Sequence, residues 1–138
     1  MANLLYDSFR EYACDGTIDL DSDTFKCALF TSAYTPAASN ATFADLTGEV
    51  SGDGYTAGGQ ALTNVTWTRS GATVTFDADD PSWTNATITA RYAAIYKSGT
   101  ANEIVNPLVC LLDFGADKGV TGGTFTVTLN AGGILTLS

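Results

Sequence analysis

Histidine is absent from this 138-residue sequence. Its absence removes the side chain that most often acts as a general base near neutral pH, and also the commonest protein ligand of metal ions. We therefore predict a protein that is not an enzyme, that has no catalytic residues, and that holds neither a cofactor nor a metal ion.

Basic residues are scarce. Six lysine and arginine residues stand against fifteen aspartate and glutamate residues, and the formal net charge is -9. A chain with this charge repels phosphate backbones, and its basic residues are scattered, so we expect no binding to nucleic acid. The same charge keeps a free subunit soluble before it assembles with other proteins.

Long apolar runs and a secretion signal are also missing. No apolar stretch approaches the roughly 20 residues that a membrane-spanning helix needs, so we expect no contact with a membrane. The N-terminus lacks a basic segment followed by an apolar run, which predicts synthesis and folding in a cytoplasm. The three cysteines, Cys14, Cys27 and Cys110, form no CxxC pair. They are expected to be free thiols, with one disulfide and one free thiol as the alternative.

The residues that are present are typical of one β domain spanning positions 1–138. Hydrophobic residues make up 45% of the chain, which is enough for a core without a metal ion or a disulfide. Residues 3–14 carry apolar side chains at helical spacing and predict a helix, with Asn3 as its N-cap and Gly16 at its end. This helix either covers one end of a sheet or forms an arm that grips a neighbouring subunit.

From residue 25 onward the apolar pattern changes to a period of two, which is typical of strands. The runs 64–70 and 73–78 flank a turn and predict a hairpin. The run 86–96 is apolar on both sides near its end, which predicts burial of both faces. The other predicted strands are 25–31, 107–114, 124–129 and 134–137. Six to eight strands with regular turns predict a mainly β protein with one short N-terminal helix, folded as an antiparallel sandwich or barrel.

Residues 33–58 interrupt the strand pattern and form a long segment rich in glycine, serine and threonine. A loop of this length is uncommon in a compact domain unless it has a role, which favours either binding or wrapping over a neighbour. The glycine-rich loop at residues 48–59 does not cradle a phosphate, because it lacks the Gly-Lys-Ser/Thr ending of a P-loop. Its glycines are expected to allow tight turns and close backbone contact.

Two groups of acidic residues are candidates for binding a cation. Aspartates alternate over residues 19–23 as they do at the start of a calcium loop, but Thr24 and Phe30 occupy the positions that require glycine and glutamate. A solvated acidic turn is the better interpretation. Asp77 and Asp79 would share a face of a continued strand, where they could hold a cation or simply form a charged strand end. Nothing identifies the acid and base of a glycoside hydrolase.

Large side chains supply candidate contacts with other proteins. We predict that Trp67 lies in the core. Trp83 follows Pro81 in a predicted loop and Tyr55 lies in the glycine-rich segment, so both are expected to anchor an interface. As the alternative, Trp67, Trp83, Tyr34 and Tyr55 could form a sugar-binding platform. The full set of interface candidates is Leu4, Phe9, Tyr34, Tyr55 and Trp83.

Several stretches of the chain resemble a family of small structural proteins encoded by tailed bacteriophages. These stretches are residues 28–36, 49–59, 90–96, 113–115 and 132–137. The most specific is the second, the loop that ends in Gly-Tyr-Thr-Ala-Gly-Gly, whereas the first 24 residues carry little of the resemblance. No catalytic motif comes with the family, so no site residues are carried over.

The resemblance implies that the chain is part of a virion. The first expectation is a decoration (cement) protein on the head surface that binds the major capsid protein or other virion proteins. The second is a tail, neck or fibre component, with a carbohydrate-binding receptor module as one form of it. We also expect synthesis in the cytoplasm of the host bacterium and assembly as a homo-oligomer, with a trimer as the expected form. The predicted helix or residues 33–58 would make the contacts.

Overall fold

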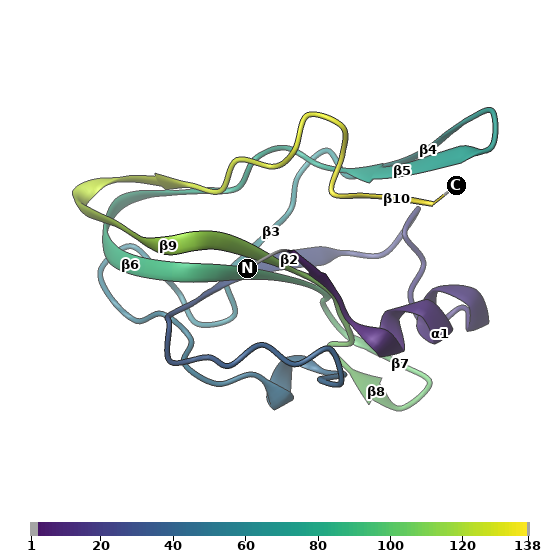
Figure 1. Ribbon diagram of the computed structural model, residues 1–138, viewed down its shortest axis with the longest axis horizontal. Helices are drawn as coiled ribbons and strands as arrows, with labels where there is room; N and C mark the ends of the chain where they lie inside the picture. The colour runs from purple at the N-terminus through teal and green to yellow at the C-terminus, as the bar shows by residue number, and fades with distance from the viewer. Residues whose placement is uncertain (1–2, 138) are drawn as a thin grey trace.

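The computed structural model describes residues 3–137 and is mainly β, with 49% of residues in strands (Figure 1). The elements are β1 (Leu4–Leu5), α1 (Asp7–Asp15), β2 (Phe25–Phe30), the 3-10 helix η1 (Phe43–Asp45), β3 (Gln60–Ala61), β4 (Thr66–Ser70), β5 (Thr73–Asp77), β6 (Ser82–Lys97), β7 (Thr100–Ala101), β8 (Ile104–Val105), β9 (Leu108–Thr126) and β10 (Leu135–Leu137). The prediction of a mainly β fold with one short N-terminal helix is confirmed.

Two sheets form the body of the protein, and every strand pairing within residues 3–137 is antiparallel. The larger sheet has the order β1-β9-β6-β2-β3, and the smaller has the order β10-β5-β4. Figure 1 shows the smaller sheet as a separate layer above the larger one. Both sheets keep open edges, so the arrangement is an open sandwich and not a closed barrel.

The second half of β6 is buried on both faces, as its sequence predicts, because Tyr92 to Tyr96 are all buried. One face of the larger sheet carries Leu29 and Ile95 into the main core, which also contains Phe76 of the smaller sheet. The rings of Phe25 and Phe76 meet edge to face across the two layers, with centroids 5.1 Å apart. The opposite face of the larger sheet therefore needs a second cover.

The first part of residues 33–58, with Tyr34, Phe43 and Leu46, provides that cover, and Figure 1 shows it in blue below the larger sheet. Tyr34 is buried, and its ring lies 5.6 Å from that of Phe30. The ring of Phe43, in η1, lies 4.6 Å from that of Tyr96. This segment is thus a packed layer of the fold, and its aromatic side chains contact the sheet of their own chain.

The glycine-rich part of this segment is fixed to β2 by a partly buried hydrogen-bond network. The Tyr55 hydroxyl donates to the Glu49 carboxylate (2.6 Å) and accepts from the Leu29 amide (3.0 Å). The same carboxylate accepts from the Gly58 amide (2.7 Å). The next residue, Gly59, has φ +79°, and a Cβ there would stand 1.9 Å from the Cys27 carbonyl oxygen. Glycine is required at this position because the two backbones touch.

Three sequence predictions are corrected by the structure. The helix begins at Asp7 and not at residue 3, because Leu4–Leu5 pair with Leu111 and Cys110 at the edge of the larger sheet. Asn3 is not the N-cap, and its side chain accepts a hydrogen bond from the Asp113 amide (2.9 Å). The predicted strands 107–114 and 124–129 are joined, since β9 follows β6 through several register shifts and ends at Thr126. Gly16, in the left-handed region with φ 87°, does end the helix.

We expect Gly59→Ala to lower the free energy of unfolding by about 3 kcal/mol, because the new methyl group overlaps the β2 backbone. Gly58→Ala is the matched control, since its φ is also positive (+93°) but its Cβ would meet nothing closer than the Tyr96 hydroxyl at 3.5 Å. The control should lose about 1 kcal/mol, the ordinary cost of a left-handed alanine. Urea unfolding of both variants measures the difference, and equal losses would show that Gly59 is not pressed against β2.

Candidate functional site

The first acidic group of the sequence is a self-contained turn. Asp19 accepts hydrogen bonds from the Ser22 hydroxyl (2.8 Å) and the Asp21 amide (2.9 Å), and these bonds hold the pKa of Asp19 below its ordinary value. The Asp23 carboxylate accepts from the Asp19 amide (2.7 Å) and pairs with Lys97 (2.9 Å). The carboxylates are therefore engaged with their own turn, as the interpretation of a solvated acidic turn requires.

The three aspartates of the second acidic group bind three separate parts of the chain. Asp77 accepts from the Ala78 amide (2.8 Å), and Asp80 accepts from the Leu129 amide (2.9 Å). Asp79 accepts from the side chains of Thr63 and Asn64. Within residues 3–137, no group of three or more histidine, cysteine, aspartate or glutamate side chains is placed to hold a metal ion.

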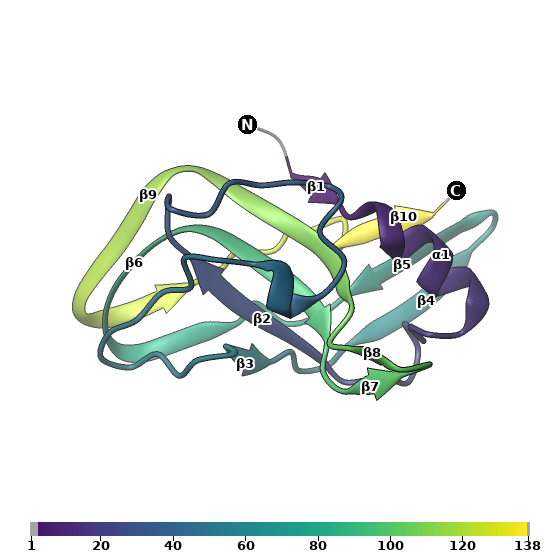
Figure 2. The ribbon, with the colours of Figure 1, turned by 90° about the horizontal axis from the view of Figure 1, so that it is seen from below.

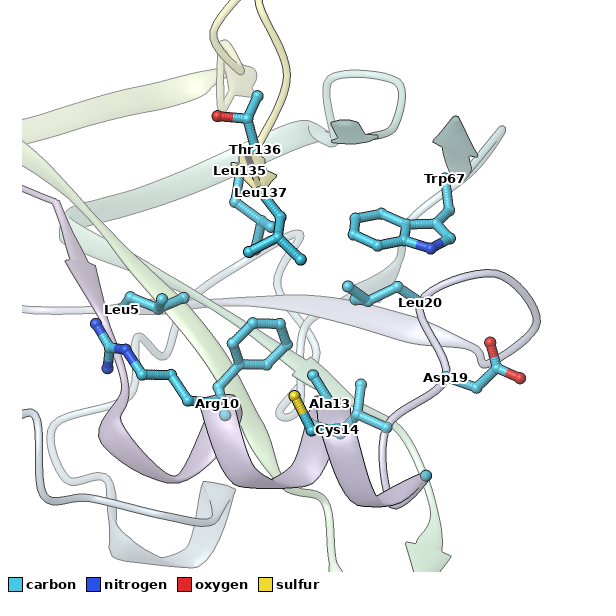
Figure 3. A pocket seen from close by; sticks show the side chains of 13 residues that line it. Leu5, Arg10, Ala13, Cys14, Asp19, Leu20, Trp67, Leu135, Thr136 and Leu137 are labelled. Carbon is cyan, nitrogen blue, oxygen red and sulfur yellow. The ribbon is translucent and has the colours of Figure 1, made fainter. Parts of the chain in front are cut away.

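The surface feature that does stand out is an apolar groove of about 500 Å³ between α1 and the smaller sheet. We call it the α1–β10 groove (Figure 3). Its lining residues are Leu5, Phe9, Arg10, Ala13, Cys14, Gly16, Ile18, Asp19, Leu20, Trp67, Leu135, Thr136 and Leu137. Their side chains are mostly aliphatic or aromatic, which is the composition of a surface that binds by excluding water.

The groove has a floor and a roof that come from distant parts of the sequence. The floor is one face of α1 together with the chain that follows it, and it includes Phe9 and Leu20. The roof is the smaller sheet, from which Trp67, Leu135 and Leu137 point toward the helix, whereas Thr136 points away (Figure 3). Leu135 and Leu137 share a face because they are two residues apart on β10.

The stretch of chain that supplies the floor of the groove is rich in acidic residues. Residues 7–23, which form the floor, contain six carboxylates and a single guanidinium, that of Arg10. Arg10 is already paired with Asp7 at 3.6 Å, and both side chains are exposed. The ionisable side chains among the lining residues are Arg10, Cys14 and Asp19. Most of the other lining side chains are apolar, which is a composition suited to docking.

The structure distributes the predicted interface residues differently from the sequence expectation. Phe9 (6% exposed), Tyr34 (3%) and Trp83 (6%) are buried within the chain. Leu4 and Tyr55 are half-buried and pack on their own cores. Phe9 is the member of the set that lines the groove.

The roles of the two tryptophans are exchanged. Trp83 was expected in an exposed loop, but β6 starts at Ser82, and the alternation of that strand turns Trp83 inward. There its ring lies 6.4 Å from that of Phe125 and 5.9 Å from that of Tyr55. Trp67, predicted in the core, is half-buried and lines the groove. Leu135 and Leu137, which also line it, were seen in the sequence only as part of a closing strand.

The three cysteines are free, and they differ in accessibility. Cys14 is exposed and lines the groove. Cys27 and Cys110 are buried, and both stand opposite Ile95, one on each side of β6. Two strand spacings, about 9.5 Å, separate them, which exceeds the reach of a disulfide.

No protein-family model, no curated protein and no solved structure matches this chain. Within residues 3–137, no helix has the length and apolar character needed to cross a membrane. What the chain does must therefore be inferred from its own surfaces, and the α1–β10 groove is the surface with the clearest capacity to bind.

We predict that one thiol per native chain reacts quickly with a thiol reagent, and that the other two react only after unfolding. Burial raises the pKa of Cys110 to about 12 and that of Cys27 well above its ordinary value, so both stay protonated and covered. Absorbance with a chromogenic disulfide reagent measures the two phases. The variant Cys14→Ser should lose the fast phase, and a fast phase of two or three thiols would contradict the burial of Cys27 and Cys110.

Proposed function

We propose that this chain is a non-enzymatic structural subunit of a tailed-bacteriophage particle, placed on the head as a decoration (cement) protein that binds the major capsid protein. The observation that carries the proposal is the α1–β10 groove, an open surface lined mostly by apolar side chains. Such a surface holds a neighbour, and burying it would supply the binding free energy.

The resemblance to small structural proteins of tailed phages supports the same role. Its most specific stretch, residues 49–59, contains Glu49, Tyr55 and the glycines that fix the covering segment to β2. Another resembling stretch, residues 132–137, includes Leu135 and Leu137 in the roof of the groove. The helix in the floor of the groove belongs to the first 24 residues, where the resemblance is weakest, as expected if each family member fits its own neighbour.

The net charge of -9 suits this role, because it keeps free subunits apart until they meet a complementary shell. A symmetric shell presents the same site many times, and an oligomer of the chain could engage several sites together. Each groove then needs only modest affinity. A homo-oligomer of the chain, expected to be a trimer, is part of the proposal.

A carbohydrate-binding role on a tail or fibre is less well supported by the geometry. A sugar platform needs aromatic faces open to solvent. Two of the aromatic candidates for such a platform, Trp83 and Tyr34, are buried. Tyr55 is half-buried, and its hydroxyl is already engaged with Glu49 and Leu29.

The test compares particles made from the encoding phage genome with and without the gene for this chain. We expect electron cryomicroscopy to show density of this size at repeated positions on the head of complete particles, and its return when purified chain is added to the deficient heads. Deficient heads should also release DNA at a lower temperature. Density confined to the tail would replace the head assignment with a tail role, and absence of the chain from the particle would overturn the proposal.

A further inference from the structure

The hairpin of β7 and β8, residues 100–105, is an exposed tip that the body of the protein holds in place. The Asn102 side chain donates a hydrogen bond to the Thr17 hydroxyl (2.8 Å), and the Gly99 amide donates to the Asn106 side chain (2.8 Å). These bonds fix the tip to the body, so little order has to be gained when a partner binds it. The tip presents Val105, which is 56% exposed.

Glu103, in the same tip, has a backbone conformation that favours glycine. Asn102 and Glu103 are the two loop residues of the hairpin, and their φ angles are 50° and 67°. A turn of this kind prefers Asn-Gly, because a residue with a Cβ is strained at the second position. Strained residues of this kind cluster at functional sites. The chain thus keeps an exposed carboxylate beside the exposed Val105, at a position where glycine would be less strained.

A second pocket, of about 420 Å³, lies along the last part of β9 and the chain that follows it, and we call it the β9 pocket. Its lining residues are Phe114, Lys118, Gly119, Val120, Thr124, Phe125, Thr126, Val127 and Thr128. Among these lining residues, all within the described part of the chain, Lys118 alone carries a charge, since Asp117 beside it does not line the pocket. The pocket therefore suits an apolar side chain that is accompanied by a carboxylate.

The tip and the β9 pocket lie toward opposite ends of the molecule. Figures 1 and 2 show β7 and β8 toward the right of the longest axis and the yellow-green end of β9 at the left. Glu103 is the only charged side chain in residues 98–112, and Lys118 is the only one in residues 118–138. A contact between two tips would oppose two carboxylates, and a contact between two pockets would oppose two ammonium groups. A contact between tip and pocket pairs opposite charges, so it is the contact between copies that the charges favour.

We propose that the chain associates with itself head to tail, with the β7–β8 tip of one copy in the β9 pocket of the next. Val105 enters the pocket, and the Glu103 carboxylate pairs with the Lys118 ammonium group of the next copy. A contact between two different patches closes into a ring when the rotation between copies allows it, and a rotation of one third of a turn gives a trimer. The inference rests on the homo-oligomer of the proposed function and names the surfaces that join its copies.

Sedimentation velocity of the purified chain measures this association. The net charge of -9 opposes it, so we expect a weak, reversible equilibrium that reaches a trimer at concentrations up to about 1 mM. Glu103→Lys and Lys118→Glu should each weaken the association about fivefold, because each opposes like charges. The double variant should recover it, because opposite charges meet again. A chain that stays monomeric over this range, or a double variant no better than the single ones, would overturn the inference.

Two serine variants test the apolar part of the contact. Val105→Ser removes the exposed side chain of the tip, and Leu137→Ser is the matched control, because Leu137 is similarly exposed (63%) but lines the α1–β10 groove. Val105→Ser should weaken the association about tenfold, and Leu137→Ser should leave it unchanged. Equal association of the two variants would contradict the placement of Val105 in the contact.

Glu103→Gly separates binding from stability. Glycine relieves the strained turn, so the melting temperature should not fall, whereas the association should weaken about fivefold because the carboxylate is lost. A lower melting temperature with unchanged association would show that Glu103 serves the fold of the tip and not the contact between copies.

Disulfide trapping identifies the patches that meet. In a Cys14→Ser background, Val105→Cys places a thiol on the tip and Thr126→Cys places one at the β9 pocket. Oxidation of the variant that carries both should give covalent dimers and trimers, and each variant alone should stay monomeric. Covalent dimers of Val105→Cys alone would show a contact between two tips, and the absence of covalent oligomers from the double variant would equally reject the proposed contact.

These outcomes can be told apart from those of the particle experiment. A chain that stays monomeric could still coat the head through the α1–β10 groove. Absence of the chain from the particle, with the association between tip and pocket as expected, would remove the phage role but keep the contact between copies.

Discussion

The structure depends on the burial of β6, which lies between two neighbouring strands and between two covering layers, one on each face of the larger sheet. β6 pairs with β2 on one side and with β9 on the other, and its second half has no face open to water. A strand of this kind requires a cover above and below the sheet, since its apolar side chains alternate between the two faces. The rest of the chain is arranged to supply these two covers.

The two covers are built differently, and the difference decides where the protein can bind. One cover is the smaller sheet, a regular layer with an open edge at β10. The other is the segment 33–58, which has little regular structure and is held by Tyr34, Phe43 and the hydrogen bonds of Glu49. The apolar side chains of that segment are used to cover the larger sheet. The apolar surface that remains open is the α1–β10 groove, between the smaller sheet and α1.

The sequence predicted the strands wherever alternation was sustained, as in β2, the hairpin of β4 and β5, and β6. It missed β1, because Leu4 and Leu5 fit the spacing of a helix as well as that of a strand. They form a strand because they pair with β9. The sequence also predicted Trp67 in the core and Trp83 at an interface, whereas Trp83 is buried and Trp67 is half-buried. The two-residue period shows which residues share a face, but not what that face meets.

The groove could not be read from the sequence for the same reason. Its lining comes from residues 5–20, from Trp67 and from residues 135–137, and only the complete fold places these three parts of the chain around one groove. The role of residues 33–58 as a cover was equally hidden, since their composition is that of an exposed loop. The glycines of the loop 48–59 predicted close backbone contact, and Gly59 does lie against the backbone of β2.

The most direct test of this account is native-state hydrogen exchange along the covering segment. The amides of Thr31, Val50 and Leu62 donate to the carbonyl oxygens of Gly48, Leu29 and Phe25, which ties the segment and its flanks to one another and to β2. If the segment is a layer of the fold, these amides should exchange as slowly as those of β6, because they open only when the whole protein unfolds. Exchange at nearly unprotected rates, with β6 still protected, would show a detachable loop and would contradict the account.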